Sequence, residues 1–209
     1  LFKLIMNSLP YSNYIEKILI YWFKNKKTTD KTDFDRWFIK SRENDDEIKK
    51  KFRNILKEAE KGNLLEWLID KEGYLAHIIL MDQFSRQIYR DKPKAFKNDN
   101  KILFFMEMGL DNHLHKYNAV EKMFILMPYQ HTINKKCQRI GAQILKKLYD
   151  EEVNVLEKKI LREALKHQLG HLNVLKKFNR FPKRNYIMRR SPTEEEIDYM
   201  DRTPLTQPY

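Results

Sequence analysis

Residues Asp82 to Asp99 read DQFSRQIYRDKPKAFKND and follow an apolar run from Tyr74 to Met81. The apolar run predicts a mostly buried helix, from about Gly73 to Tyr89, which ends before Pro93 because proline cannot continue a helix. The last turns of this helix carry polar and cationic side chains in place of apolar ones. A buried helix that becomes rich in arginine either caps its own end with these cations or delivers them to a site.

Helical patterns continue on both sides of this stretch, and we find no convincing strand or hairpin signal. Apolar side chains recur at helical spacing over residues 13–24, 44–61, 99–109, 119–127, 129–149 and 152–178. Capping residues mark several ends: Asn44 and Ser191 are expected as N-caps, and Gly62 as a left-handed stop. The pattern predicts an all-α fold, a single domain of stacked antiparallel helical hairpins with roughly seven to nine helices. We expect residues 1–12 to be an extension, 13–200 the helical domain and 201–209 a tail.

The composition supports this class of fold. A chain of 209 residues with five glycines and seven prolines is poor in the turn residues that an all-β sandwich needs. The single cysteine, Cys137, excludes an intrachain disulfide and favours a reducing, intracellular compartment. This compartment is the cytoplasm, or the mitochondrial matrix if residues 1–5 are a presequence remnant. No apolar run approaches the roughly 20 residues of a membrane span, so no membrane association is expected.

The net charge of +12 has two interpretations. A large positive charge is typical of proteins that bind nucleic acids or anionic membranes. It also arises from a lysine-rich composition, which we favour because the lysines are scattered along helices rather than gathered in a tail. The sequence contains no zinc-finger spacing, RNA-recognition signature or glycine-rich phosphate loop.

Three segments resemble the motifs of a mainly bacterial family, domain of unknown function 924. Residues 82–90, followed by Ala95-Phe96 and Asp99, resemble its signature D-Q-F-P-R-N-I-[FY]-R, then A-F and D. Residues 128–131 resemble its second motif, P-[FY]-E-H. His171 with residues 178–185 resembles its third motif, H-x6-F-G-R-F-P-H-R-N. The resemblance covers roughly residues 13 to 200 and implies a fold similar to tetratricopeptide-repeat proteins, with no settled activity.

The chain departs from these motifs at several positions. Ser85 and Gln87 stand in place of Pro and Asn, and Asn179 in place of Gly. Gln130 replaces the acid beside His131, and Lys183 replaces a His. The last two changes remove two titratable groups, so acid–base chemistry at these positions in the family would be weakened or lost in this protein.

Four arginines form the leading candidate for a binding site. Arg86 and Arg90 are four residues apart and share one helix face, with Tyr89 beside them. Arg180 and Arg184 lie in a loop stiffened by Pro182, next to Asn185. Because a guanidinium pairs with carboxylate or phosphate in a fork geometry, the two arginine pairs predict a preorganised anion site. The alternative is that each arginine pairs with Asp82, Asp91, Asp99 or Glu195 and only holds helix ends in place.

The histidines complete the predicted site. His131 is expected to open a helix just after Pro128, where the helix dipole would lower its pKa and keep it neutral as a general base. Gln130 and His171 are expected to contact the ligand. His167 and His171 are four residues apart, but no third ligand or zincin pattern accompanies them, so we predict no metal and no cofactor.

Two functions fit these observations. The first is an inter-helix pocket, lined by the arginines and histidines, that binds an anionic small molecule and turns it over if His131 is catalytic. The second is a non-catalytic scaffold that holds a peptide, protein or RNA partner on a basic helical surface. The oligomeric state does not follow from the sequence.

Overall fold

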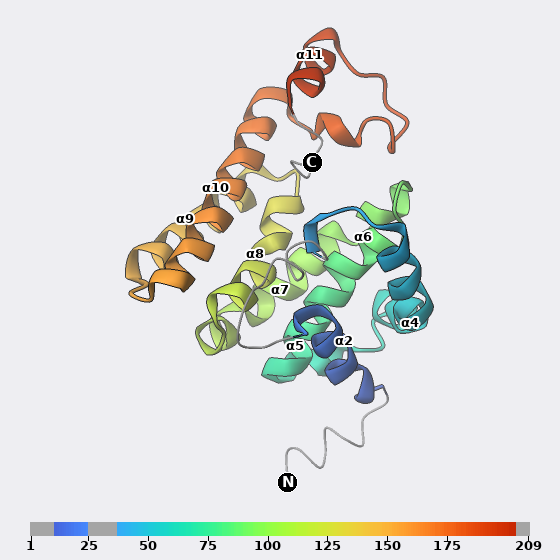
Figure 1. Cartoon of the computed structure of the whole chain (residues 1–209), viewed down its shortest axis with the longest axis vertical. Helices are drawn as coiled ribbons and strands as arrows, with labels where there is room; N and C mark the ends of the chain where they lie inside the picture. The colour runs from blue at the N-terminus through green and yellow to red at the C-terminus, as the bar shows by residue number, and fades with distance from the viewer. Residues whose placement is uncertain (1–10, 25–36, 204–209) are drawn as a thin grey trace. The chain divides into compact units, whose positions relative to one another are not determined.

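A computed structural model describes residues 11–24 and 37–203 of the chain. Every regular element in these two ranges is a helix, which confirms the predicted all-α class (Figure 1). No helix in this part of the chain is long and apolar enough to cross a membrane. The contacts divide the chain into two compact units. Unit 1 consists of Leu1–Arg90 and Ala95–Tyr117, and unit 2 of Asp91–Lys94 and Asn118–Tyr209.

Unit 1 is built around one continuous helical segment, Lys71 to Ile88. The elements of unit 1 are α2 (Asn13–Phe23), α4 (Arg42–Lys61), a 3-10 helix (Leu65–Ile69), α5 (Lys71–Ile78), a π-helical stretch (Ile79–Phe84), α6 (Ser85–Ile88), α7 (Asp99–His113) and a final 3-10 turn (Leu114–Lys116). A short 3-10 turn, Pro93–Phe96, crosses the boundary between the units. The predicted central helix is therefore confirmed, with the addition of a π-helical stretch.

The central segment is buried on all sides because α2, α4 and α7 all pack against it. Every side chain from Tyr74 to Tyr89 is buried. The ring of Phe84 makes edge or tilted contacts with Tyr21, Trp22 and Phe52, at centroid distances of 5.9, 5.5 and 4.7 Å. These aromatic contacts fix the rotation of the helix just before Arg86.

Two expected helix ends in unit 1 differ from the prediction. The N-cap of α4 is Ser41, whose side chain accepts a hydrogen bond from the backbone of Asn44, so the expected Asn44 cap is wrong by one turn. The left-handed stop at Gly62 is confirmed, with φ of 92°. Gly109 does not end α7, which continues to His113. Its missing side chain leaves room for the ring of Tyr74, so Gly109 serves packing rather than termination.

Unit 2 consists of three long helices and a C-terminal segment. Its elements are α8 (Ala119–His131), α9 (Lys135–Glu151), α10 (Val155–Phe178), a 3-10 turn (Pro182–Arg184) and α11 (Glu194–Arg202). α9 and α10 form a hairpin, and α8 packs against both of them. The most deeply buried side chains of this unit include Leu126, Leu145, Leu161, Leu175 and Phe181.

The prediction placed one helix over residues 129–149, and this is wrong. Pro128 lies inside α8, which runs on to His131, and the chain breaks at Thr132 to Asn134. Asn134 is the N-cap of α9, since its side chain accepts hydrogen bonds from Lys136 and Cys137. A proline removes one helical hydrogen bond but does not by itself end a helix that tertiary packing supports.

The start of the last helix also differs from the prediction. Thr193, rather than Ser191, caps α11, and it forms a reciprocal capping box with Glu196. A hydroxyl side chain was expected as the N-cap, and one is found, but it lies two residues after the expected position.

Candidate functional site

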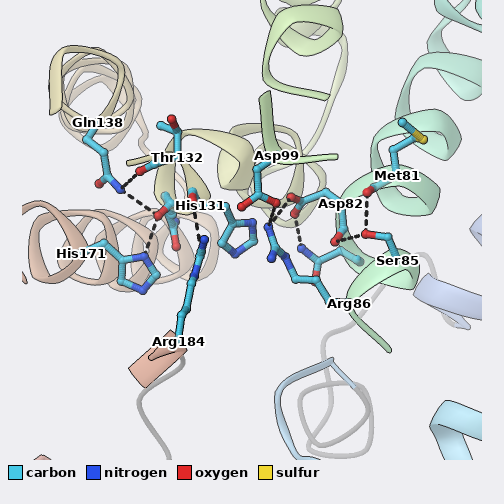
Figure 2. Close-up of polar contacts among 12 residues, drawn as sticks. Met81, Asp82, Ser85, Arg86, Asp99, His131, Thr132, Gln138, His171 and Arg184 are labelled. Carbon is cyan, nitrogen blue, oxygen red and sulfur yellow. Dashed lines mark hydrogen bonds and ion pairs between the residues drawn. The ribbon is translucent and has the colours of Figure 1, made fainter. Parts of the chain in front are cut away.

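The nine predicted site residues fall in both units. Arg86, Tyr89 and Arg90 belong to unit 1. The remaining residues belong to unit 2: Gln130, His131, His171, Arg180, Arg184 and Asn185. We therefore describe the polar contacts of each unit separately. Figure 2 labels Arg86 in unit 1 and His131, His171 and Arg184 in unit 2.

In unit 1, Arg86 lies between two carboxylates. One of its terminal nitrogens is 3.2 Å from Asp82 and 2.7 Å from Asp99 (Figure 2). Asp82 also accepts a hydrogen bond from Gln83, and the guanidinium lies over the ring of Phe96 at 5.6 Å. The Arg86 side chain is only 8% exposed. Because Arg86 is already paired with two carboxyl groups, this cluster does not favour an anionic ligand.

Arg90 is also paired with a carboxylate. Its terminal nitrogen donates to Asp45 of α4 at 2.7 Å, and its Nε atom donates to the other oxygen of the same carboxylate. Asp45 is 45 residues away in sequence, and no local pattern identifies it as the partner. Tyr89, between the two arginines, is buried with 6% of its surface exposed.

The π-helical stretch, Ile79–Phe84, lies directly before Arg86 and contains Asp82. Such stretches contain one extra residue per turn and often occur at functional sites. Ser85 follows it, and its hydroxyl donates to the carbonyl of Met81 at 2.7 Å (Figure 2). No sequence pattern indicates this stretch, because its residues are buried on every face of the helix.

In unit 2, four of the predicted residues meet at the C-terminal end of α8: Gln130, His131, His171 and Arg184. His131 is the last residue of this helix, so the expectation that it opens a helix is wrong. The argument that a helix N-terminus keeps the ring neutral therefore does not apply to it. The error follows directly from reading Pro128 as a helix end.

The backbone carbonyls at this end of α8 have no partners within the helix and are bound by side chains instead. The Gln130 carbonyl oxygen accepts from His171 Nδ1 at 2.9 Å and from Gln138 Nε2 at 2.8 Å. Gln138 also donates to the carbonyl of Thr132 at 3.0 Å. Arg184 donates to the carbonyl of His131 at 3.1 Å, as Figure 2 shows. Three elements are thereby joined at one helix end.

We call His131, His171 and Arg184 the histidine–arginine cluster. These side chains come from α8, α10 and the Pro182–Arg184 turn, and their residues are 7%, 6% and 6% exposed. The two imidazole rings lie 6.5 Å apart. The ring of Phe181 packs against two members of the cluster. Its centre lies 5.6 Å from that of the His171 ring and 4.4 Å from the Arg184 guanidinium.

The hydrogen bond to a carbonyl fixes the protonation of one ring atom. A carbonyl oxygen only accepts, so Nδ1 of His171 must carry the proton. Nε2 of the same ring is then an acceptor when the ring is neutral and a donor when it is charged. The cluster thus combines a permanent cation with an imidazole of known tautomer.

Arg180 and Asn185 bind a different group, the carboxylate of Glu196. Arg180 donates to both of its oxygens, each at 2.5 Å, and Asn185 donates at 3.1 Å. These contacts, led by the Arg180 bonds, lower the pKa of Glu196 to about 2. Glu195, which the sequence suggested as an arginine partner, instead pairs with Lys177, whose Nζ atom lies 3.0 Å from its carboxylate. Burial lowers the pKa of Lys183, the residue that stands in place of the family's His.

Within residues 11–24 and 37–203, no group of three or more His, Cys, Asp or Glu side chains could hold a metal ion. His167 and His171, which are four residues apart, lie in this part of the chain and belong to no such group.

The comparisons with known proteins agree with the fold. A solved structure of a protein of unknown function from Agrobacterium tumefaciens superposes with a TM-score of 0.78 at 25% sequence identity. The match covers 93% of this chain and 100% of that chain. No curated protein matches the sequence. The family model described as "Bacterial protein of unknown function (DUF924)" matches residues 18–203, and its bacterial description gives the mitochondrial alternative no support. The predicted resemblance is confirmed, and the chain belongs to this family of uncharacterised bacterial proteins.

Proposed function

We propose that the histidine–arginine cluster of unit 2 binds an anionic small molecule. The observation that carries the proposal is the convergence of two imidazoles and one guanidinium, from three separate elements, in a place where each residue is at most 7% exposed. The predicted site is thereby narrowed to His131, His171 and Arg184, with Gln130 and Asn185 as supporting residues.

The electrostatics favour an anion over a neutral ligand. A guanidinium is always charged, and charges interact more strongly in a poorly solvated place than in water. Arg184 is oriented by a carbonyl oxygen and an aromatic ring. A carboxylate or phosphate group would match the planar fork of donors of its guanidinium.

The cost of burial supports the same conclusion. Placing a cation in a buried cluster costs several kcal/mol, and an apolar side chain of similar volume often gives a more stable protein. Gln138 already satisfies two of the three carbonyls at the end of α8, so holding this helix end does not require all three cluster side chains. Binding of an anionic ligand would account for the buried cation, whereas capping of the helix end alone does not require it.

His131 is retained as the general base of any turnover. Two imidazoles 6.5 Å apart, centre to centre, are close enough for one to position a ligand and the other to exchange a proton with it through one water molecule. The proposal for binding does not depend on this step.

Thermal shift and calorimetry with defined anions test the proposal. The probes are inorganic phosphate, a dicarboxylate, a nucleotide and a coenzyme A ester. The shift in melting temperature that each causes is compared between the wild-type protein, Arg184→Gln and Arg180→Gln. We expect at least one probe to raise the melting temperature of the wild type, and Arg184→Gln to abolish this shift.

Arg180→Gln is the matched control, because Arg180 is committed to Glu196 and should retain the shift. His131→Asn provides a second variant if Arg184→Gln does not fold. Equal shifts in all variants, or no shift with any probe, would overturn the proposal. A salt-sensitive shift with RNA alone would favour the scaffold function instead.

A further inference from the structure

The charges of α9 oppose its helix dipole. Lys135 and Lys136 occupy its first turn and Asp150 and Glu151 its last, whereas a helix is stabilised by acidic residues at its start and basic residues at its end. No acidic residue occurs in the first turn and no basic residue in the last. This arrangement of charges does not stabilise α9 by itself, so we looked for a contact outside the helix that it would stabilise.

A groove of about 640 Å³ runs between α9 and α10. Apolar side chains form its floor, and charged side chains of α9 line one wall. The lining residues are Ala142, Gln143, Lys146, Lys147, Asp150, Glu151, Leu165 and Leu169. Leu169 is 43% exposed although it lies between two helices, so the groove presents apolar surface to a partner.

Exposed aliphatic side chains lie beyond both ends of α9. Ile133, just before the helix, is 61% exposed. Val153, just after it, is 91% exposed, and Val155 and Leu156 follow at 81% and 74%. Ile133 is a single exposed side chain, whereas Val153, Val155 and Leu156 lie close together in the chain and form a group of exposed aliphatic side chains, which is a feature of contact surfaces.

We propose that a second copy of this chain docks on the α9–α10 face, with the two α9 helices antiparallel across a two-fold axis near Gln143. A two-fold axis at residue 143 places residue 133 opposite residue 153, and residue 136 opposite residue 150. The exposed Ile133 then meets the exposed Val153 of the other copy. Lys136 meets Asp150, and the two helix dipoles run in opposite directions.

The charge pattern selects this partner over a different protein. Lys136 near one end of α9 and Asp150 near the other would meet reciprocally when the helix is turned through a half rotation, so this pair is complementary to itself. The same register brings Arg139 near Lys147, whose amine has Glu151 at 3.9 Å to balance the added charge. Lys146 and Asp150 already form an ion pair at 2.6 Å, so the contact would join existing pairs into a network.

Charge reversal tests the register. The wild-type protein is expected to be a dimer by analytical ultracentrifugation. Lys136→Glu alone and Asp150→Lys alone should each raise the dimer dissociation constant by about tenfold, because two-fold symmetry breaks two contacts per substitution. The double variant should return toward the wild-type value. Lys57→Glu, the same charge change on α4, should have no effect.

Melting temperature separates this result from misfolding. Both single substitutions place a charge that suits the dipole of α9, so neither should destabilise the folded subunit. A reduced mass with unchanged or raised thermal stability of the dilute protein would therefore report loss of the contact rather than loss of the fold.

Cross-linking tests the pairing directly. In a Cys137→Ser background, Ile133→Cys combined with Val153→Cys should form a disulfide-linked dimer under mild oxidation, while either cysteine alone should not. α9 spans about 25 Å, which keeps the two engineered thiols of one chain apart. A wild-type protein that remains monomeric at high concentration, or equal cross-linking of single and double cysteine variants, would overturn the proposal.

Discussion

His77 is a buried titratable side chain that does not belong to the candidate site. It is 1% exposed, and its Nδ1 atom has no hydrogen-bond partner among the residues described. Its ring meets Phe105 edge-on at a centroid distance of 5.4 Å. Burial, with a smaller effect from Lys101, lowers the pKa of His77 to about 3. The folded protein therefore holds this imidazole neutral at any moderate pH.

This burial predicts a pH-dependent stability. Above pH 6.5 the ring is neutral in both the folded and the unfolded chain, and His77 has no effect on the pH dependence. Below pH 6.5 only the unfolded chain takes up the proton, so the free energy of unfolding falls as pH decreases toward 3. We expect a loss of about 2 kcal/mol between pH 7 and pH 5 from this residue. Urea unfolding at both pH values measures it.

His77→Leu provides the comparison, since it keeps an apolar side chain of similar size in the same place. The difference between the two pH values should shrink by most of that amount in the variant. Glu196 contributes little between pH 7 and pH 5, because its stabilising effect is lost only as pH falls from the ordinary carboxyl pKa of 4.5 toward the folded pKa of about 2. An identical pH dependence in both proteins would show that the folded state admits the charged ring.

The candidate site shows which residues a sequence can identify. The arginines and histidines were found because they lie in polar motifs within or beside apolar helices. Their partners were not, since Asp45 is 45 residues from Arg90 in the chain and Glu196 is 16 residues from Arg180. Side chains that meet only through tertiary packing leave no local pattern, and they decide whether an arginine is neutralised.

At the scale of the helix, the sequence predicted which segments are helical better than where they end. Amphipathic spacing identified α4, α9 and α10, whereas the all-round burial of the central helix concealed its π-helical stretch. Pro128 and Gly109 both looked like ends and are both interior, because packing around α8 and α7 outweighs local preference.

Two glycines within helices should respond to the same substitution in opposite ways. A side chain at Gly109 would overlap the ring of Tyr74, whose hydroxyl donates to the carbonyl of Met106. Gly109→Ala should therefore cost roughly 1–3 kcal/mol. Gly170, on α10, has nothing within 4 Å of the added atom, so Gly170→Ala should stabilise the protein by roughly 0.5–1 kcal/mol.

Equilibrium unfolding of the two variants measures this pair of effects. If Gly109→Ala proved as stable as the wild type, Tyr74 would have a second position available, and the packing role assigned to this glycine would be wrong. A destabilising Gly170→Ala would indicate that the surface of α10 is covered at that position.

For the whole molecule, the sequence predicted one helical domain over residues 13–200, and these bounds stay a prediction. Within the chain, contacts cluster in two compact units, and the short segment Asp91–Lys94 belongs to unit 2 although the residues on both sides of it belong to unit 1. Composition does not change at the boundary near Tyr117, and no linker marks it, so the sequence carries no sign of the division.

Separate expression tests whether unit 2 is an independent folding unit. Its helices enclose the side chains of Leu145, Leu161 and Leu175, none of which is exposed. We expect residues 118–203 alone to be helical by circular dichroism and to melt cooperatively. A fragment that shows helicity without a cooperative transition would establish that residues 13–200 form the single folding unit that the sequence predicted.

The π-helical stretch, Ile79–Phe84, also affects how this family can tolerate a change in length. Because the stretch winds one surplus residue into the helix, deletion of a single codon there would still leave an unbroken helix. Loss of one residue from Ile79 to Met81 would close the widened turn, so Asp82 and Arg86 would stay four residues apart on one face. In the α-helical turns before and after the stretch, the same loss would rotate the following residues by about 100°. A one-residue deletion should therefore be tolerated better within this stretch than beside it.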